Sequence, residues 1–265
     1  MIPALAMRSV TKTLGAGSDR CVATARVLSR IDLDVWPAEV VGVAGADRCA
    51  RTTLLLCAAG LLTPDEGEIR WFGDPVRTAP VRGVRFVSEH ETSYPFVSVR
   101  EALQQAASAE RGDVGLRRIE HAMALLGLDD QEDRPISHLA PEARRCLVVA
   151  RALLTRPRLL VIDGWRCGAR PPTRRCACDG LRYLADDGCA VLLSTDAVDG
   201  LHVGAYRATV LRAGRVEHET RRDLHLDAGQ PAASARASGG DERERAASLV
   251  AEPRHGSVDP MFRRP

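Results

Sequence analysis

The chain has 265 residues, a formal net charge of +2, 45% hydrophobic residues and 27% charged residues. This composition is that of a globular protein, and the length allows one large domain or two small ones. We expect no bilayer-spanning segment, because no apolar run reaches about 18 residues. We expect no secretory signal at residues 1–8. A nucleic-acid partner is also not expected, because the net charge is near neutral.

Arginine supplies almost all of the positive charge, because Lys12 is the only lysine beside 36 arginines. Such a skew is typical of coding bias, so an arginine where lysine is customary says little about chemistry by itself. The eight cysteines are predicted to be free thiols, because no secretory signal is apparent. Cys167, Cys176 and Cys178 lack the spacing of a zinc knuckle, so buried or surface thiols are favoured over a metal site.

Hydrophobic patterning predicts alternating strands and helices. Residues 31–35 alternate apolar and polar side chains, whereas 39–45 form a nearly continuous apolar run, typical of a strand buried on both faces. A helix is expected over 52–60, with Gly60 as its stop. In chain order the other predicted elements are a strand over 84–87, a helix through 116–126, a helix through 146–153, strands over 159–163 and 190–195, and a hairpin over 208–216 that turns at Ala213-Gly214.

This alternation predicts an α/β layered fold. We expect residues 1–225 to form the structured domain, with a mostly helical subdomain at about 99–155. Residues 226–265 are rich in Ala, Ser, Gly, Arg and Glu and show little periodicity, which predicts a disordered tail. A short helix at about 242–250 is the alternative within that tail.

A strand, a tight turn and a helix that begins in Thr-Thr are the setting of a phosphate-binding loop. The pattern G-x-x-x-x-G-K-[ST] falls on residues 45–52, where Gly45 and Thr52 match while Ala50 and Arg51 replace the second glycine and the lysine. Glycines in such loops let backbone N–H groups curl around phosphates. The candidate nucleotide-binding segment is Gly45, Ala46, Asp47, Arg48, Cys49, Ala50, Arg51, Thr52 and Thr53.

The surroundings of this loop carry a family resemblance. Residues 41–73 resemble the Walker A region of ABC transporter ATP-binding domains, including the Gly-Leu-Leu-x-Pro stretch that starts at Gly60. The resemblance continues in order and covers about residues 5–220. Its further pieces are a Q-loop-like segment at 86–103, the approach to the signature at 126–139, the signature helix and Walker B strand at 150–163, the strand before the switch at 191–195, and the terminal hairpin at 210–216.

The resemblance implies a P-loop NTPase core of the ABC type with a helical subdomain and an antiparallel β portion. It implies ATP as the ligand, with Mg²⁺ on Thr52, Glu89 and Asp163. It also implies a head-to-tail homo- or heterodimer with another ABC ATPase domain, and a transmembrane permease subunit docked beside Glu89. The corresponding place in the cell is the cytoplasmic face of the membrane.

Several positions that carry the family's chemistry hold other residues. Gly164 stands at the position of the catalytic glutamate, and losing a general base typically costs about 10²–10⁴ in rate. Asp196 stands at the switch histidine, where a carboxylate would repel the γ-phosphate. Leu14 lies near the place of an adenine-stacking aromatic, Arg170 replaces the D-loop aspartate, and Glu89 replaces the Q-loop glutamine. The resemblance therefore implies no intact catalytic residue.

The signature motif, which in the family caps ATP bound by the partner domain, is also altered. Leu-Ser-Gly-Gly-Gln falls on Leu139, Ala140, Pro141, Glu142 and Ala143. Ala140 has no hydroxyl, Pro141 has no N–H, and Glu142 adds negative charge. Pro141 and Glu142 are better explained as a good helix start.

From this pattern we expect the ATP-binding subunit of an ABC transporter, which couples ATP binding and hydrolysis to transmembrane transport, with hydrolysis impaired. The alternative is a non-enzymatic pseudo-ATPase that acts as a scaffold or regulator. The sequence leaves open whether the chain is an enzyme, and it does not indicate the transported substrate or its direction.

Overall fold

The computed structural model describes residues 1–15, 24–76, 83–88, 96–108, 116–165, 171–195 and 207–221. Four residues singled out in the sequence, Glu89, Cys167, Arg170 and Asp196, lie outside the described residues, as does the expected tail at 226–265.

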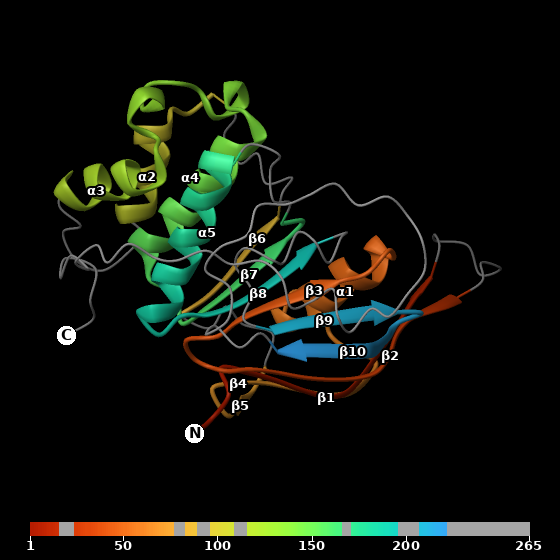
Figure 1. Ribbon diagram of the computed structural model, residues 1–265. Coiled ribbons are helices and arrows are strands. Elements are labelled where there is room, and N and C mark those ends of the chain that lie inside the picture. Colours follow the sequence, from red (N-terminus) through yellow and green to blue (C-terminus); the bar gives the residue numbers. More distant parts are fainter. Residues whose placement is uncertain are drawn as a thin grey trace, which may run out of the picture.

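A six-stranded sheet with the strand order β10-β9-β3-β8-β7-β6 forms the centre of the fold (Figure 1). Its neighbours pair in parallel, except that β9 and β10 form an antiparallel hairpin. The predicted strands and the hairpin turn at Ala213-Gly214 are confirmed. The strands are β3 (Val40–Ala44), β6 (Val84–Ser88), β7 (Leu159–Asp163), β8 (Ala190–Thr195), β9 (Arg207–Arg212) and β10 (Arg215–Arg221).

Both faces of this sheet are covered, as the continuous apolar runs predict. Successive side chains of a strand point to opposite faces, so Leu160 and Ile162 of β7 pack into one core and Leu159 and Val161 into another. β8 divides its side chains in the same way. The sheet is therefore the middle layer between two separate apolar cores.

Helices cover the first face of the sheet. Figure 1 shows α2, α3, α4 and α5 gathered on one side, and their apolar residues form one core with β7 and β8. Gly180 allows the close approach of α5 to α4, because a Cβ there would lie 2.7 Å from a methyl carbon of Val149. The helices are α2 (Val99–Ser108), α3 (Leu116–Leu126), α4 (Pro141–Thr155) and α5 (Pro171–Asp186), with short 3₁₀ turns η1 (Asp129–Gln131) and η2 (Ile136–His138) between α3 and α4.

The second face is covered by α1 (Arg48–Ala58) and by a four-stranded antiparallel sheet of order β2-β1-β4-β5. Leu54 and Leu55 of α1 share a core with both sheets, so α1 lies between them. Trp71 closes this layer, because its indole N–H donates to the Ala58 carbonyl at 2.8 Å. The strands are β1 (Leu5–Gly15), β2 (Thr24–Val35), β4 (Glu66–Trp71) and β5 (Asp74–Pro75).

Two predicted boundaries were wrong. Helix α1 begins at Arg48 rather than Thr52, because the Asp47 carboxylate caps its first turn by accepting the Ala50 N–H. Strand β2 begins at Thr24, well before the predicted strand over 31–35. Its pairing with β1 contains register shifts, which break the simple alternation that the sequence pattern relies on.

The corner between β2 and β3 is held by a largely buried ion pair. The Arg207 guanidinium donates to the Glu39 carboxylate at 2.9 Å and also to the Asp34 carbonyl, and the Arg207 side chain is only 5% exposed. Glu39 in turn accepts the Trp36 N–H. These contacts fix β9 beside β3. Among the described helices, none has the length and apolarity needed to cross a membrane.

The buried thiol of Cys57 generates a testable prediction. Burial raises its pKa to about 11, whereas Cys49 is exposed at the other end of the same helix. In the native chain at pH 8 we expect iodoacetamide to modify Cys57 at least about a hundredfold more slowly than Cys49, because the thiolate is the nucleophile. Peptide mapping by mass spectrometry after quenching measures both rates.

The same pKa predicts a pH dependence of stability. The folded chain keeps this proton above the unfolded value of about 8.5. The contribution to stability is therefore complete below that pH and falls as the pH rises toward 11. Equal alkylation rates of Cys49 and Cys57 in the folded chain would contradict the raised pKa of Cys57, on which both predictions rest.

Candidate functional site

The carboxyl ends of the parallel strands meet at one edge of the sheet. In the pairing register Ala44 of β3 lies opposite Thr195 of β8 and Val210 of β9, and Ser88 of β6 lies opposite Asp163 of β7. The segments that follow these strands therefore begin at the same edge. This is where ligands bind in open α/β sheets.

Asp163 joins three of these segments through its carboxylate. Its Oδ2 accepts a hydrogen bond from the Thr52 hydroxyl at 2.8 Å, and its Oδ1 accepts one from the Ser194 hydroxyl at 2.6 Å. The Ser194 Oγ also accepts the Gly164 N–H at 3.0 Å. The structure thus brings together the predicted residues Thr52, Asp163 and Gly164, which come from α1 and from the end of β7.

Ser194 is a site residue that the sequence analysis missed. It is only 1% exposed and holds one oxygen of Asp163 in place. The signal that could have found it is the Ser-Thr pair that ends the apolar run of β8, because buried polar groups are almost always hydrogen-bonded.

The 45–53 segment runs from the end of β3 into the first turns of α1. N–H groups of a helix's first turn have no partner within the helix and point toward its N-terminal end, where anions bind. Here the Asp47 carboxylate takes one of them, since its Oδ1 accepts the Ala50 N–H at 3.1 Å. Arg51 is 7% exposed and donates from Nη1 back to the Gly45 carbonyl. The arginine therefore folds over the turn at the start of its own helix.

Gly45 is required by the close approach of β9. A Cβ at this position would lie 2.5 Å from the Leu211 carbonyl oxygen, a distance that real Cβ atoms essentially never show. The packing against Leu211 therefore requires glycine at position 45 whether or not a phosphate binds there. The remaining positions of the segment differ in burial: Ala46, Asp47, Arg48 and Cys49 are exposed, Thr52 is intermediate, and Ala50 and Thr53 are buried.

The oxygen atoms at this edge fit Mg²⁺. Thr52 Oγ1 and Asp163 Oδ2 are 2.8 Å apart, which is close to the separation of two neighbouring ligands in an octahedral Mg²⁺ shell. A hydroxyl and a carboxylate are hard oxygen donors of the type that Mg²⁺ prefers, with water and substrate phosphates as its other usual ligands. Elsewhere, the described part of the chain has no cluster of three or more His, Cys, Asp or Glu side chains that could hold a metal ion.

The segment fits a triphosphate only in part. The helix N-terminus and the Arg51 charge favour an anion. The Asp47 carboxylate opposes one, because it already accepts the Ala50 N–H and would lie beside the phosphates with like charge. A bound triphosphate would also compete with the Gly45 carbonyl for Arg51.

Gly164 has a backbone that a glutamate would not readily adopt. Its φ is +86°, in the region that favours glycine, and its N–H is held by Ser194. The backbone at residue 164 is therefore adapted to glycine.

The altered signature forms the start of α4, as the sequence analysis favoured. Ala140 is the N-cap residue and gives no side-chain capping bond, Pro141 is the first helical residue, and Glu142 lies in the first turn. Leu139 and Ala143 are buried, so they pack rather than face a ligand. Ala140 and Pro141 of this motif are exposed, and Glu142 is half-buried.

Comparisons with known proteins agree with this architecture. A family description for ABC transporters matches residues 28–165. The ribose import ATP-binding protein RbsA 1 of Streptomyces coelicolor is 27% identical over 226 residues, which are 80% of this chain and 43% of that protein. The aliphatic sulfonates import ATP-binding protein SsuB of Rhodopseudomonas palustris is 30% identical over 223 residues, which are 83% of this chain and 75% of that protein. The chain thus spans less than half the length of the first relative.

Among solved structures, the dimeric structure of MJ0796, a bacterial ABC transporter cassette, is similar with a TM-score of 0.69 and 19% identity. The similarity covers 83% of this chain and 100% of that one. It confirms the predicted α/β fold of P-loop NTPases of the ABC type.

The role assigned to Ser194 predicts a difference between two buried hydroxyls. Ser194→Ala removes the donor to Asp163 and the acceptor of the Gly164 N–H, so we expect the free energy of unfolding to fall by about 1–3 kcal/mol. Thr209→Val is the control, because Thr209 Oγ1 is buried and has no hydrogen-bond partner in the described structure. That change should cost less than about 0.5 kcal/mol or stabilise. Urea unfolding of both variants tests this, and equal losses would refute the role of Ser194.

Proposed function

The chain belongs to the family of ABC transporter ATP-binding domains, and on this basis we propose that it is the ATP-binding subunit of a membrane transporter. The observation that carries the proposal is the hydrogen bond between Thr52 and Asp163, whose Oγ1 and Oδ2 atoms are 2.8 Å apart. The family resemblance assigns Thr52 to the Walker A motif and Asp163 to the Walker B motif, and both side chains are of types that bind Mg²⁺. When bound, Mg²⁺ would neutralise the phosphate charge of ATP, and Thr52 and Asp163 are the described residues that would hold it.

The proposed partners follow from the family. The similar MJ0796 cassette is dimeric, and the two relatives are named as import ATP-binding proteins. We propose that this chain pairs with another ABC ATPase domain, either a second copy or a different chain, and with a transmembrane permease subunit. This assembly would place it at the cytoplasmic face of the membrane, as a peripheral subunit.

We further propose that nucleotide binding is weak and that hydrolysis is slow or absent. Three features support this: the Asp47 carboxylate that competes for a loop N–H, the Arg51 side chain bonded back to Gly45, and the glycine-adapted backbone of Gly164. The residues at the signature position support this as well. The exposed Ala140 has no hydroxyl to offer a partner's nucleotide, and the half-buried Glu142 adds a charge of the same sign as the phosphates.

The alternative function is a pseudo-ATPase that regulates or scaffolds through protein contacts. It is favoured by the same features of Asp47 and Gly164, which leave the fold intact while altering the site. Titration with ATP and Mg²⁺ distinguishes the two: binding at cellular nucleotide concentrations supports the transporter subunit, and absence of binding at millimolar ATP supports the scaffold.

Impaired hydrolysis predicts a low turnover. The purified full chain should hydrolyse ATP at least about a hundredfold more slowly than the roughly 1–10 per second of an ordinary enzyme. Asp163→Asn serves as the control for contaminating ATPases. Turnover of roughly 1–10 per second that disappears in Asp163→Asn would refute the proposal of impaired hydrolysis.

The opposing charge of Asp47 predicts a gain in affinity when it is removed. Asp47→Ser keeps a good capping side chain but removes the negative charge, so ATP-Mg²⁺ should bind about five- to tenfold more tightly. Asp130→Ser, which removes an exposed carboxylate from η1, is the matched control and should leave the affinity unchanged. Calorimetric titration measures both, and an unchanged or lower affinity of Asp47→Ser would show that this carboxylate does not compete with phosphate.

A further inference from the structure

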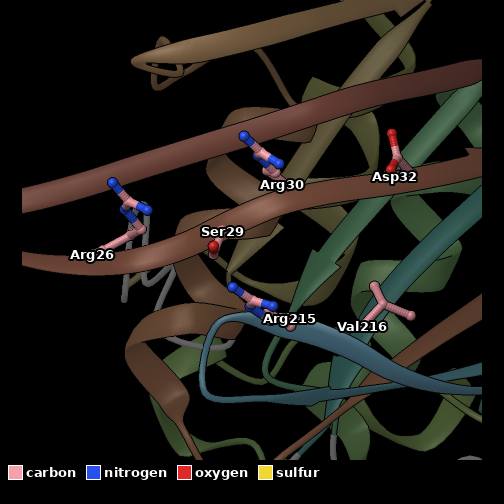
Figure 2. Close-up of a pocket in the computed structure, with 6 residues that line it drawn as sticks. All are labelled: Arg26, Ser29, Arg30, Asp32, Arg215 and Val216. Carbon is pink, nitrogen blue, oxygen red and sulfur yellow. The ribbon is translucent and has the colours of Figure 1, made fainter.

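A second concave site lies away from the strand-end edge, between β2 and β10. It is a pocket of about 570 Å³, and Figure 2 shows the side chains around it. Ser29 lies between the arginines, with Arg26 and Arg30 on the same strand and Arg215 on the neighbouring hairpin strand. The lining residues are Arg26, Ser29, Arg30, Asp32, Arg215 and Val216.

The three arginines of this pocket, Arg26, Arg30 and Arg215, carry charge that the described part of the chain does not neutralise. All three are exposed, and none of their guanidinium groups has an ion pair or hydrogen bond with a described residue. By contrast, exposed arginines of the same sheets do have carboxylate partners, as the Arg8–Asp34 pair at 2.7 Å and the Arg212–Glu217 pair at 3.2 Å illustrate. No contact with a described residue therefore explains why three like charges lie at one pocket.

One carboxylate lines the pocket. Asp32 accepts the Ser9 N–H through Oδ1 at 2.8 Å, which ties it to β1. The lining side chains therefore carry a net charge of +2, which is the charge a phosphate-bearing ligand would neutralise.

The backbone around the pocket is closely fixed. The Ser29 N–H donates to the Gly214 carbonyl at 2.8 Å, which docks the β9–β10 turn on β2. Gly214 has φ +71°, and a Cβ there would lie 2.4 Å from the Val27 carbonyl oxygen, so this contact requires glycine. Arg215, the next residue, is consequently held at a set position beside β2.

Arg30 itself has an unusual backbone. Its φ is +50°, rare for a residue with a side chain, and it lies in a segment of β2 where the pairing with β1 shifts register. Such strain is costly and gathers at functional sites. Here it turns Arg30 outward at the pocket, while the neighbouring Ile31 remains fully buried.

The chemistry of the lining indicates the class of ligand. Guanidinium groups form paired hydrogen bonds with phosphate oxygens, and several around one pocket suit a multiply charged anion. Val216 is the single apolar residue in the lining, and no aromatic side chain contributes to it, so neither an apolar ligand nor a stacked base is favoured. The volume is within the range of small-molecule sites.

We propose that Arg26, Arg30 and Arg215 form a second anion-binding site, separate from the 45–53 segment, for a compound that carries phosphate groups. The proposal does not depend on the nucleotide function, because the two sites share no residue. The phosphate groups can belong to a free compound or to a lipid headgroup, and the experiment distinguishes these sources.

The test is a calorimetric titration of the full chain with pyrophosphate at low salt. We expect Arg26→Gln and Arg215→Gln each to weaken binding at least about tenfold, because each removes a charged donor from an exposed position without disturbing the core. Arg117→Gln, at an exposed position on α3, makes the same charge change elsewhere and should leave the affinity unchanged. Arg51→Gln, which alters the 45–53 segment, should leave the part of the binding that depends on Arg26 and Arg215 unchanged.

A parallel arm measures co-sedimentation with phosphatidylcholine vesicles, with and without phosphatidylinositol bisphosphate. Pyrophosphate binding that depends on Arg26 and Arg215 supports the site with a free phosphate compound as its ligand. Vesicle binding with the same dependence, in the absence of pyrophosphate binding, supports it with a lipid headgroup as its ligand. The proposal is overturned if neither probe binds, if the loss follows Arg51→Gln alone, or if Arg117→Gln weakens binding as much as the pocket variants do.

Discussion

The Asp163 carboxylate is the point on which the site depends. Each of its oxygens accepts one hydroxyl, Thr52 from the first helix and Ser194 from β8. Because the parallel sheet aligns the ends of β3, β7 and β8, one short acidic side chain can link all three segments. The geometry at this edge is therefore set by the sheet and remains in place although several neighbouring positions have changed.

Residues at and near this edge have structural explanations that do not involve phosphate. Gly45 makes room for the Leu211 carbonyl, Asp47 caps α1, and Arg51 is bonded to the turn that precedes it. Gly164 uses a backbone conformation that suits glycine. Each of these residues is thus accounted for by a local contact or by the backbone conformation of the fold.

Arginine, which dominates the basic residues of this chain, serves different physical purposes at different places. Arg207 is nearly buried and is compensated by Glu39 and by a backbone carbonyl, as a buried cation must be. Arg26, Arg30 and Arg215 are exposed and line one pocket, without an ion pair to a described residue. Coding bias can account for the choice of arginine over lysine, but it does not account for the presence of all three at this pocket. Their positions follow from the irregular backbone of β2 at Arg30 and from the glycine turn that docks on the same strand.

The sequence by itself determined the order of the elements, the class of the fold and the family. Buried strands such as 159–163 are continuous apolar runs, and Pro141 marks the start of α4, so near neighbours in the chain carry these signals. The sequence also found Thr52, Asp163 and Gly164 through their positions in motifs.

Only the tertiary structure decided which side chains are partners. The support of Asp163 by Ser194, the compensation of Arg207 by Glu39, and the presence of Arg26 and Arg215 at one pocket all involve residues from distant parts of the chain. The irregular pairing of β1 with β2 likewise hid the start of β2. Hydrophobic periodicity reports which way a side chain points within its own element, whereas hydrogen bonds and ion pairs depend on where separate elements lie after packing.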